Sequence, residues 1–328
     1  MNNSEYLVSI CVPIYGVEKY IERCAVSLFE QTYQNIEYIF VNDGTPDKSI
    51  ELLESVIERY PRRRSNVHII THEENLGLGA ARNTAVAAVK GEFLMHVDSD
   101  DWIDKDCVRL CVEKQLETGA DIVSTDISRV GINKTIVHHI PNYPLTKDFI
   151  LALINHTIPN NIWGRLIRTS LYEVNNIKVE GGVNFSEDLN VMPRLAYFAS
   201  KVEIVSQPMY MYECRNQNSY TSNFSEKNFF QIIVSCNCLS SFFYQKDFDC
   251  SEAVKKRLYT SLVDNLINSV KRNGNMKSYY KIRKEIDGMP SSLKSVLSFP
   301  YKVAINIRNY YCFCIYIRFV SFVKHVLK

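Results

Sequence analysis

The first hundred residues alternate between apolar runs of strand length and segments with helical spacing, and no other feature constrains the fold as strongly. Apolar runs occupy residues 7–12, 36–41, 67–71 and 92–97. The helical segments between them are residues 17–31, 46 or 47–60, and 78–90. Strands that alternate with helices predict a parallel, doubly wound sheet covered by helices.

The remainder of the chain follows a looser pattern and ends in helices. We predict helices at residues 104–118, 163–172 and 188–198, and extended segments at residues 121–124, 134–140, 202–205 and 209–212. Further helices are predicted at residues 227–244, 251–272 and from about 301. The expected organisation is an α/β domain over residues 1–220 and a helical region over residues 221–328.

A cluster of acids follows the fourth apolar run directly, as Asp98-Ser99-Asp100-Asp101. The carboxyl ends of parallel strands face the crevice where open α/β sheets bind ligands. Two carboxylates spaced as Asp-x-Asp can hold a hard divalent cation whose other ligands are phosphate oxygens. The alternative interpretation is that these residues cap a helix beginning near Trp102.

The loops after the other three strands are expected at the same edge of the sheet. Pro13 and Tyr15 offer a surface for a planar base, and Asp43 can accept hydrogen bonds from a base or a ribose. Asp43 also lies in a segment rich in turn-forming residues, so a plain turn is the alternative. The glycines before Arg82 allow close approach of a ligand, but Arg82 stands where a dinucleotide fingerprint needs its third glycine.

Four segments together carry a resemblance to glycosyltransferase family 2. They read VSICVPIY at residues 8–15, VNDGTPD at 41–47, NLGLGAARN at 75–83 and DSDD at 98–101. Their order and spacing match the family closely over residues 6–110 and more loosely to about 220. The resemblance implies a GT-A fold: a Rossmann-like, mostly parallel sheet flanked by helices, here with a C-terminal helical extension. It also implies a nucleotide-sugar half to about residue 105 and an acceptor half over residues 106–220.

The resemblance also implies a nucleotide-diphosphate sugar donor, a divalent metal (Mn²⁺ or Mg²⁺) and inversion at the anomeric carbon. The positions that it assigns to the nucleotide sugar are Pro13, Tyr15, Asp43, Arg82, Asp98 and Ser99. Asp43 would bind the base, usually uracil, and Arg82 would lie near the base or a phosphate. Asp98 would contact ribose or the metal, and Asp100 would coordinate the metal. Asn42 replaces the first of two acids usual in this motif, and we take Asp43 as the operative one.

Glu187 and Asp188 open a predicted helix in the second half. Without further context they are favourable charges at a helix N-terminus, with Ser186 as the cap. The resemblance implies instead that Asp188 is the general base and that Glu187 orients the acceptor. An inverting transfer needs one base to take the proton of the acceptor hydroxyl.

Three further positions are implied for the acceptor or the diphosphate. Trp163 and Arg165 lie in a segment that resembles the family's Trp-Asn-Lys-Leu, from which Gly164 and Arg165 depart. Trp163 can stack on a sugar face or be a buried tryptophan. Arg215 resembles, with a displaced register, an arginine that closes over the diphosphate.

The C-terminal segment 301–328 is apolar, aromatic and basic, and no acidic residue follows Asp287. Its longest uninterrupted apolar run, residues 310–317, is too short to span a bilayer. We expect an interfacial helix on anionic lipid, with packing on the catalytic domain as the alternative. Ten cysteines without a Cys-x-x-Cys pair, and a start without an apolar leader, predict reduced thiols in a cytoplasmic protein.

The sequence therefore predicts an inverting, metal-dependent bacterial glycosyltransferase. It would move a sugar from a nucleotide donor, with UDP expected, to a lipid-linked saccharide in surface polysaccharide synthesis, at the inner face of the cytoplasmic membrane. A net charge of +2 gives no reason to expect nucleic acid, and a homo-oligomer is compatible with the sequence. Two alternatives stay open: a non-catalytic sugar-nucleotide-binding or scaffold protein at the membrane, and a sugar nucleotidyltransferase. The latter would need a basic, glycine-rich phosphate loop after the first strand, which residues 13–16 do not supply.

Overall fold

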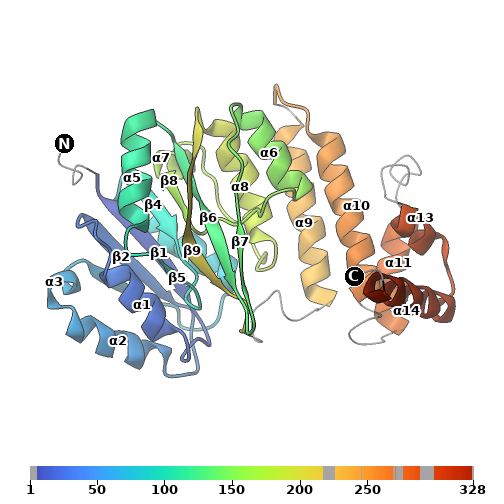
Figure 1. The fold of residues 1–328 in the computed structure, drawn as a ribbon, viewed down its shortest axis with the longest axis horizontal. Coiled ribbons are helices and arrows are strands. Elements are labelled where there is room, and N and C mark those ends of the chain that lie inside the picture. The colour runs from blue at the N-terminus through green and yellow to red at the C-terminus, as the bar shows by residue number, and fades with distance from the viewer. Residues whose placement is uncertain are drawn as a thin grey trace. The chain divides into compact units, whose positions relative to one another are not determined.

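The structure is a computed structural model that describes residues 6–216, 226–244, 246–268, 270, 276–288 and 299–326. The chain divides into two compact units, drawn together in Figure 1. The first unit comprises Met1–Leu153 and Thr157–Gln217, and the second comprises Ile154–His156 and Asn218–Lys328. Each unit has its own buried core.

The first unit is built on one mixed sheet in the order β3-β2-β1-β4-β8-β6-β9-β5, with β7 paired to β6. The strands are β1 (Val8–Ile14), β2 (Ile36–Asn42), β3 (Val67–Thr71), β4 (Phe93–His96), β5 (Trp102–Ile103), β6 (Ile122–Val130), β7 (Thr135–His138), β8 (Arg165–Arg168) and β9 (Val202–Glu213). The strands β1 to β4 pair in parallel, as the alternation predicts. The other half is mixed, because β8 pairs antiparallel with β4 and β6.

Helices cover the sheet (Figure 1). They are α1 (Ile21–Phe29), α2 (Ser49–Arg59), α3 (Pro61–Arg64), α4 (Leu78–Ala87), α5 (Cys107–Thr118), α6 (Thr146–Asn155), α7 (Ser170–Glu173) and α8 (Glu187–Phe198). The helix α4 packs on β1 and β2, where Ala81 and Ala85 meet Cys11, Ile39 and Val41. Because alanine is small, α4 lies close to the strands whose carboxyl ends face the site.

The structure corrects the prediction of a helix over residues 163–172. The strand β8 occupies Arg165–Arg168, and only the short helix α7 follows it. A segment of only four residues fits the hydrophobic period of a strand as well as that of a helix. Its pairing with β4 on one side and β6 on the other outweighs the helical spacing. The helix α6 was not predicted, and the two extended segments predicted within 202–212 form the single strand β9.

The interpretation of residues 99–101 as the cap of a helix near Trp102 is wrong. Trp102 and Ile103 form β5, which pairs antiparallel with β9 at Met211 and Tyr210. The acids therefore lie in a turn between β4 and β5, closed by a hydrogen bond of 3.0 Å from the Asp101 N–H to the Asp98 carbonyl. Their side chains therefore cap no helix at Trp102.

The second unit is helical, with α9 (Glu226–Phe243), α10 (Ser251–Asn268), α11 (Met276–Asp287), α13 (Phe299–Asn306) and α14 (Tyr310–Val326). The helix α11 was not predicted, and residues 271–272 of the helix predicted over 251–272 lie outside the described residues. Tyr259, Tyr279 and Phe313 contribute to its core. None of the described helices is both long and apolar enough to cross a membrane. All ten cysteines are unpaired, and six are buried.

Candidate active site

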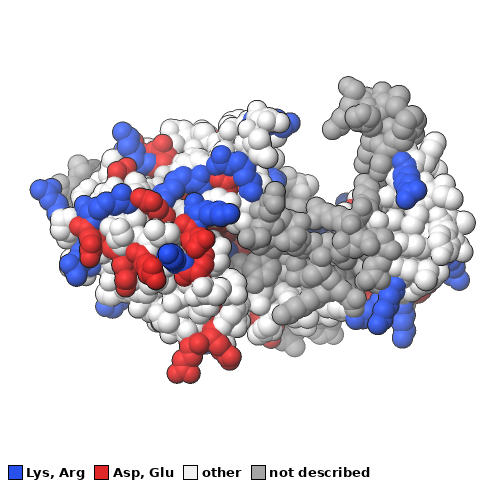
Figure 2. Space-filling view, turned by 90° about the horizontal axis from the view of Figure 1, so that it is seen from below, with Lys and Arg blue, Asp and Glu red and all other residues white. Residues whose placement is uncertain are grey.

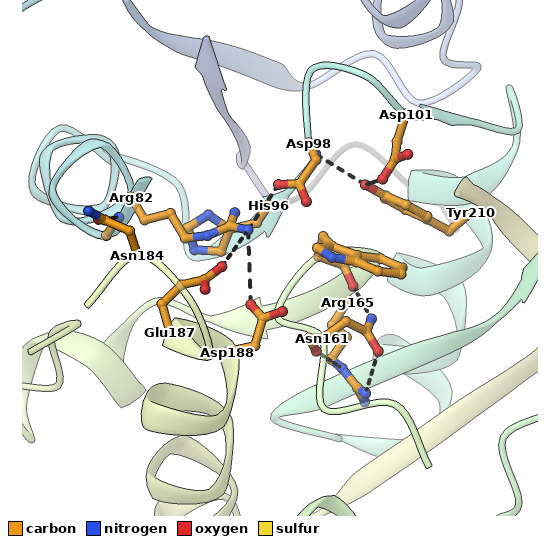
Figure 3. Close-up of polar contacts among 12 residues, drawn as sticks. Arg82, His96, Asp98, Asp101, Asn161, Arg165, Asn184, Glu187, Asp188 and Tyr210 are labelled. Carbon is orange, nitrogen blue, oxygen red and sulfur yellow. Dashed lines mark hydrogen bonds and ion pairs between the residues drawn. The ribbon is translucent and has the colours of Figure 1, made fainter. Parts of the chain in front are cut away.

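The turn after β4 presents two partly exposed carboxylates and buries a third. Asp101 is fully buried and accepts hydrogen bonds from the Tyr210 hydroxyl and from the Glu213 N–H, both at 2.7 Å. The Tyr210 oxygen also accepts a hydrogen bond of 3.1 Å from the Asp98 N–H (Figure 3). Asp101 thus fastens the turn to β9, and Asp98 and Asp100 are the two carboxylates of the turn that stay partly exposed.

The three acids of this turn strengthen one another's affinity for positive charge. Burial, and then the charge of Asp98, raise the pKa of Asp100 to about 6. Burial, followed by the charges of Asp100 and Asp98, raises the pKa of Asp101 well above its usual range. Asn216 donates a hydrogen bond of 2.8 Å to Asp100 and offsets part of this repulsion. The turn is therefore a place where a cation would be stabilised.

The donor set fits a hard divalent cation shared with a substrate. No group of three or more His, Cys, Asp or Glu side chains suited to a metal occurs within the described ranges. Asp98 and Asp100 supply carboxylate oxygens, the ligands that Mn²⁺ and Mg²⁺ accept. Two protein carboxylates completed by phosphate oxygens is the arrangement usual for Mg²⁺ in phosphate chemistry.

Arg82 joins the turn of residues 98–101, which we call the acid turn, to the first turn of α8. Its side chain is 1% exposed, and one nitrogen, Nη2, lies 2.9 Å from Asp98 Oδ1, 3.3 Å from Glu187 Oε1 and 3.9 Å from Asp188 Oδ1 (Figure 3). Burial lowers the pKa of Arg82, but the charges of Asp98, Glu187 and Asp188 outweigh burial and raise it. A single buried guanidinium thus holds acids from residues 98 and 187–188 around one point.

Asp188 has the environment of a base. It lies in the first turn of α8, after Ser186, whose φ is 65° and whose side chain makes no capping hydrogen bond. The Asp188 side chain is 20% exposed, while its buried Oδ1 has no hydrogen-bond partner. Burial and the neighbouring Glu187 raise the pKa of Asp188 well above its usual range, against the opposing effect of Arg82. A carboxylate with a raised pKa is a stronger proton acceptor.

The segment before α8 is fastened to α4 by backbone and side-chain contacts. Asn83 Nδ2 donates to the Val179 carbonyl at 3.0 Å, and the Val179 N–H donates to Asn83 Oδ1 at 2.9 Å. The Gly79 N–H donates to Asn184 Oδ1 at 3.0 Å, and a Cβ on Gly79 would lie 2.2 Å from the Val183 carbonyl oxygen. This contact leaves no room for a side chain at Gly79. The segment that leads to Asp188 is therefore positioned by the same helix that carries Arg82.

We expect Asn83→Ala to lower kcat of a reaction that depends on Asp188 by about 10- to 100-fold, with little change in KM, because the Asp188 carboxylate would be displaced. The two lost hydrogen bonds should cost about 1–3 kcal/mol of unfolding free energy. Asn66→Ala is the matched control, because Asn66 donates one hydrogen bond to the Ile36 carbonyl, at the start of β2. Equal loss of kcat in both variants would show that Asn83 acts through general stability alone.

The residues expected to bind the nucleobase of the nucleotide lie around the ends of β1 and β2. Pro13 is buried in β1, and Tyr15, just beyond it, is 49% exposed. Asp43 is 2% exposed and accepts hydrogen bonds from the Leu76 and Gly77 N–H groups at 2.9 and 2.8 Å. A ring nitrogen of His72 also lies 2.7 Å from Asp43. Asp43 thus ties the loop after β2 to the loop before α4, and its contact with a base stays a prediction.

Arg165 does not have the predicted role. It is fully buried, and its guanidinium donates to the carbonyls of Asn161 and Pro159 and to the Ser124 hydroxyl. The expectation that it contacts the acceptor or diphosphate is wrong, because its guanidinium is bound within the chain (Figure 3). Its hydrogen bonds to Asn161 and Pro159 instead shape the loop before β8.

Trp163 is packed against aromatic neighbours. It is 9% exposed and stacks on Tyr210 and Tyr212, with ring centroids 4.3 and 5.3 Å away. This packing favours the buried-tryptophan interpretation over stacking on a sugar. Ser99, also among the predicted residues, is 5% exposed between the two acids of the turn.

Arg215 is brought to the acid turn through Glu213. Both Glu213 oxygens accept hydrogen bonds from the Arg215 side chain, and Arg23 donates to Glu213 at 3.0 Å. Burial tends to raise the pKa of Glu213, but these contacts hold it at about 2. Arg23 also donates to the Asp100 carbonyl at 2.8 Å, and its guanidinium lies 3.6 Å from the Trp102 ring centroid. Arg215, 44% exposed, is therefore placed beside the turn.

Sequence reasoning missed several residues that support the site: Arg23, Asn184, Glu213 and Asn216. Arg23 looks like any surface arginine of an amphipathic helix, and its contacts with the turn span 77 and 190 residues. No local pattern marks such a residue. Only Asn184 had a usable signal, because it lies three residues before the acid pair in a glycine-containing segment.

The comparisons with known proteins point to one family. The model described as Glycosyl transferase family 2 matches residues 9–174. EpsJ of Bacillus subtilis (strain 168), named an uncharacterized glycosyltransferase, is 33% identical over 224 residues, which are 66% of this chain and 63% of EpsJ. A protein of the same strain named as glycosyltransferase EpsH is 30% identical over 291 residues, 84% of this chain and 81% of EpsH.

The fold is also found in solved structures. The crystal structure of S. aureus TarS 1-349 in complex with UDP-GlcNAc has a TM-score of 0.69 and 18% sequence identity. The superposition covers 92% of this chain and 86% of that one. This likeness confirms the expected GT-A fold, a mixed sheet with flanking helices, for this chain.

Proposed function

The chain belongs to glycosyltransferase family 2, and from this premise we propose that it is an inverting, metal-dependent hexosyltransferase that uses a UDP-sugar. The observation that carries the proposal is the position of Arg82. Its Nη2 atom lies within 3.9 Å of carboxylate oxygens from Asp98, Glu187 and Asp188. These contacts support the proposal, because a direct displacement needs an acid that binds the donor, here Asp98, close to a base, here Asp188, on a separate element.

The reaction is one displacement at the anomeric carbon. Asp188 takes the proton of an acceptor hydroxyl while that oxygen forms its bond to the anomeric carbon. The bond between the anomeric carbon and the diphosphate oxygen breaks on the opposite face, and UDP departs with the electron pair. Glu187, hydrogen-bonded to Arg82, orients the acceptor, and Arg82 keeps the base near the donor.

Asp98 and Asp100 would hold the cation of the donor complex. A divalent cation bound there supplies charge that offsets the negative charge developing on the leaving diphosphate. The raised pKa of Asp100 supports this assignment, because it reflects burial of the carboxylate and, after burial, the nearby charge of Asp98, and a bound cation would offset both. Pro13, Tyr15 and Asp43 would bind or support the base, and Arg215 would lie beside the diphosphate.

The acceptor is proposed to be a saccharide carried on a membrane lipid, in the synthesis of a bacterial surface polysaccharide. The support is the C-terminal segment, which is aromatic and basic and has no acid after Asp287. The enzyme would then work as a peripheral protein on the inner face of the cytoplasmic membrane. Such a location requires a surface that can rest on lipid.

The donor proposal predicts metal-dependent thermal stabilisation by UDP-sugars. A ligand at 100 times its Kd stabilises the folded state by about 2.7 kcal/mol, which raises the melting temperature. We expect UDP-Glc, UDP-Gal, UDP-GlcNAc or UDP-GalNAc to do so with Mn²⁺ and much less without it. GDP-Man serves as the control for the base. Stabilisation by GDP-Man alone would replace uracil with guanine as the recognised base.

The two alternative functions give different results in the same assay. A scaffold protein would bind UDP tightly but would not release UDP from any UDP-sugar. A sugar nucleotidyltransferase would consume a nucleoside triphosphate and a sugar phosphate. Four intact acids, at positions 98, 100, 187 and 188, favour the glycosyltransferase. Slow metal-dependent hydrolysis of UDP-sugar by the wild type would support it directly.

A further inference from the structure

The helix α14 has one face in the core of the second unit. Tyr310, Phe313 and Ile317 are 8%, 0% and 4% exposed. They pack in one cluster with buried residues of α10, α11 and α13, among them Tyr279 and Ile282. The core of the helical unit therefore fixes the rotation of α14 about its axis, so its opposite face is held outward.

The opposite face of α14 is also apolar. Tyr311, Ile315 and Phe319 are 67%, 68% and 63% exposed, and we call these three residues the α14 stripe. Residues four apart lie on the same side of an α-helix, so the three side chains form one continuous band. An ordinary surface helix turns polar side chains to water on the face opposite its core. A continuous band of large apolar side chains marks a surface that binds something.

Cations flank the α14 stripe. Arg308 and Arg318 are exposed at its two ends, and α14 contains no acidic residue. On the face shown in Figure 2, the described part of the second unit shows mainly Lys and Arg side chains, whereas the first unit shows both signs. Apolar side chains between cations match the interface of an anionic bilayer, which offers hydrocarbon and phosphate at neighbouring depths.

We propose that the α14 stripe is a membrane-contact surface that lies on anionic lipid. Tyr311, Ile315 and Phe319 enter the boundary between headgroups and acyl chains, and Arg308 and Arg318 meet lipid phosphates. The helix lies along the interface. This inference deepens the proposed function, on which it rests for its purpose: a lipid-linked acceptor is met at the same surface.

A second copy of this chain fits the stripe less well. A symmetric pair would bury the apolar bands but would also bring Arg308 and Arg318 of both copies together, with no acid on α14 to neutralise them. Like charges at a desolvated interface are unfavourable. The charge pattern thus favours a negatively charged surface as the occupant.

Vesicle sedimentation with the full chain tests the inference. The probes are vesicles of phosphatidylcholine alone and vesicles that also contain phosphatidylglycerol. The stripe variant carries Tyr311→Ser, Ile315→Ser and Phe319→Ser, and the charge variant carries Arg308→Gln and Arg318→Gln. The matched control carries Ile132→Ser, Val174→Ser and Tyr244→Ser, which remove three apolar side chains elsewhere that are more exposed than those of the stripe. All substituted positions are on the surface, so circular dichroism should show unchanged folding.

The wild type and the control should bind the anionic vesicles and bind the neutral ones weakly. The stripe variant should bind anionic vesicles at least about tenfold more weakly, because three large apolar side chains no longer enter the interface. The affinity of the charge variant for anionic vesicles should be about 20- to 30-fold lower than that of the wild type at low salt. Added salt should reduce this difference in affinity between the two proteins. Equal binding by the stripe variant and the control would overturn the proposal. The proposal would also be overturned if the wild type formed a dimer and bound no vesicles, and if the stripe substitutions converted that dimer to monomers.

The outcome does not depend on the proposed chemistry. Asp188→Asn should bind vesicles as well as the wild type, because Asp188 lies in the other unit. The stripe variant should hydrolyse soluble UDP-sugar at the wild-type rate. Vesicle binding without turnover would count against the proposed function alone, and turnover without vesicle binding would count against the membrane-contact surface alone.

Discussion

Asp188→Asn is expected to lower the rate of sugar transfer by about 10²- to 10⁴-fold, the contribution typical of a general base. The asparagine keeps the shape of the side chain but cannot accept the proton of the acceptor hydroxyl. Donor binding should persist, because Asp98, Asp100 and Arg82 are unchanged. The measurement is UDP release from a UDP-sugar with acceptor and Mn²⁺, with donor affinity determined in parallel.

Glu180→Gln is the matched control for this variant, because Glu180 is an exposed acid in the segment before α8. It should keep wild-type turnover. Turnover by Asp188→Asn within a few-fold of the wild type would remove Asp188 from the mechanism. Loss of donor affinity together with turnover would show that Asp188 serves binding and not proton transfer.

The environment of Asp188 also predicts a pH dependence. Burial and Glu187 raise its pKa, with Arg82 opposing them. Because the base acts only when it is ionised, turnover should fall as the pH drops through this raised pKa, at a higher pH than an ordinary aspartate would give. A pH profile of kcat in the wild type checks this expectation. A flat profile down to about pH 4, the ordinary pKa of an aspartate, would contradict it.

Asp100→Asn is the second large effect we expect, with a loss of at least about 100-fold in metal-dependent turnover. The substitution removes a carboxylate ligand, so Mn²⁺ should no longer enhance the thermal stabilisation given by a UDP-sugar. Asp148→Asn changes an exposed acid on α6 and should leave both properties intact. Stabilisation of Asp100→Asn equal to that of the wild type would end the metal assignment.

The same substitution should make the ligand-free protein more stable. The pKa of Asp100 is about 6 in the folded protein, above its ordinary value of 3.8, so the folded state binds this proton more tightly than the unfolded chain does. Ionisation of Asp100 therefore costs stability as the pH rises from about 4 to about 6. At about pH 8 without metal, the free energy of unfolding of Asp100→Asn should be about 1–2 kcal/mol higher than that of the wild type. A less stable variant would show that Asp100 supports the fold.

The sequence was most informative where the chain contacts itself locally. The four parallel strands and the helices between them follow from hydrophobic periodicity, and the ligand edge follows from the ends of those strands. The acid turn after β4 and the pair at the start of α8 could be located in the same way. That these two groups meet at Arg82 is shown only by the structure, because sequence spacing carries no such information when Glu187 lies 105 residues from Arg82.

The predictions were wrong at residues whose secondary structure or burial is determined by tertiary contacts. Residues 165–168 form a strand because β4 and β6 pair with them, and a four-residue segment contains too little pattern to reveal that pairing. Arg165 was assigned to the acceptor or the diphosphate because its segment resembles the family's Trp-Asn-Lys-Leu. Its burial depends on carbonyl and hydroxyl oxygens that surround it in the fold. Arg23 and Glu213 support the acid turn across similarly long separations.

The most direct test of the central claim is anomalous diffraction from crystals of this protein grown with Mn²⁺ and UDP. The claim is that one cation joins the diphosphate to the turn after β4, beside the base on α8. The manganese peak should lie within coordination distance of Asp98 and Asp100 and of the diphosphate oxygens, with the uracil between Tyr15 and Asp43. A manganese or diphosphate position away from Asp100 would contradict the account.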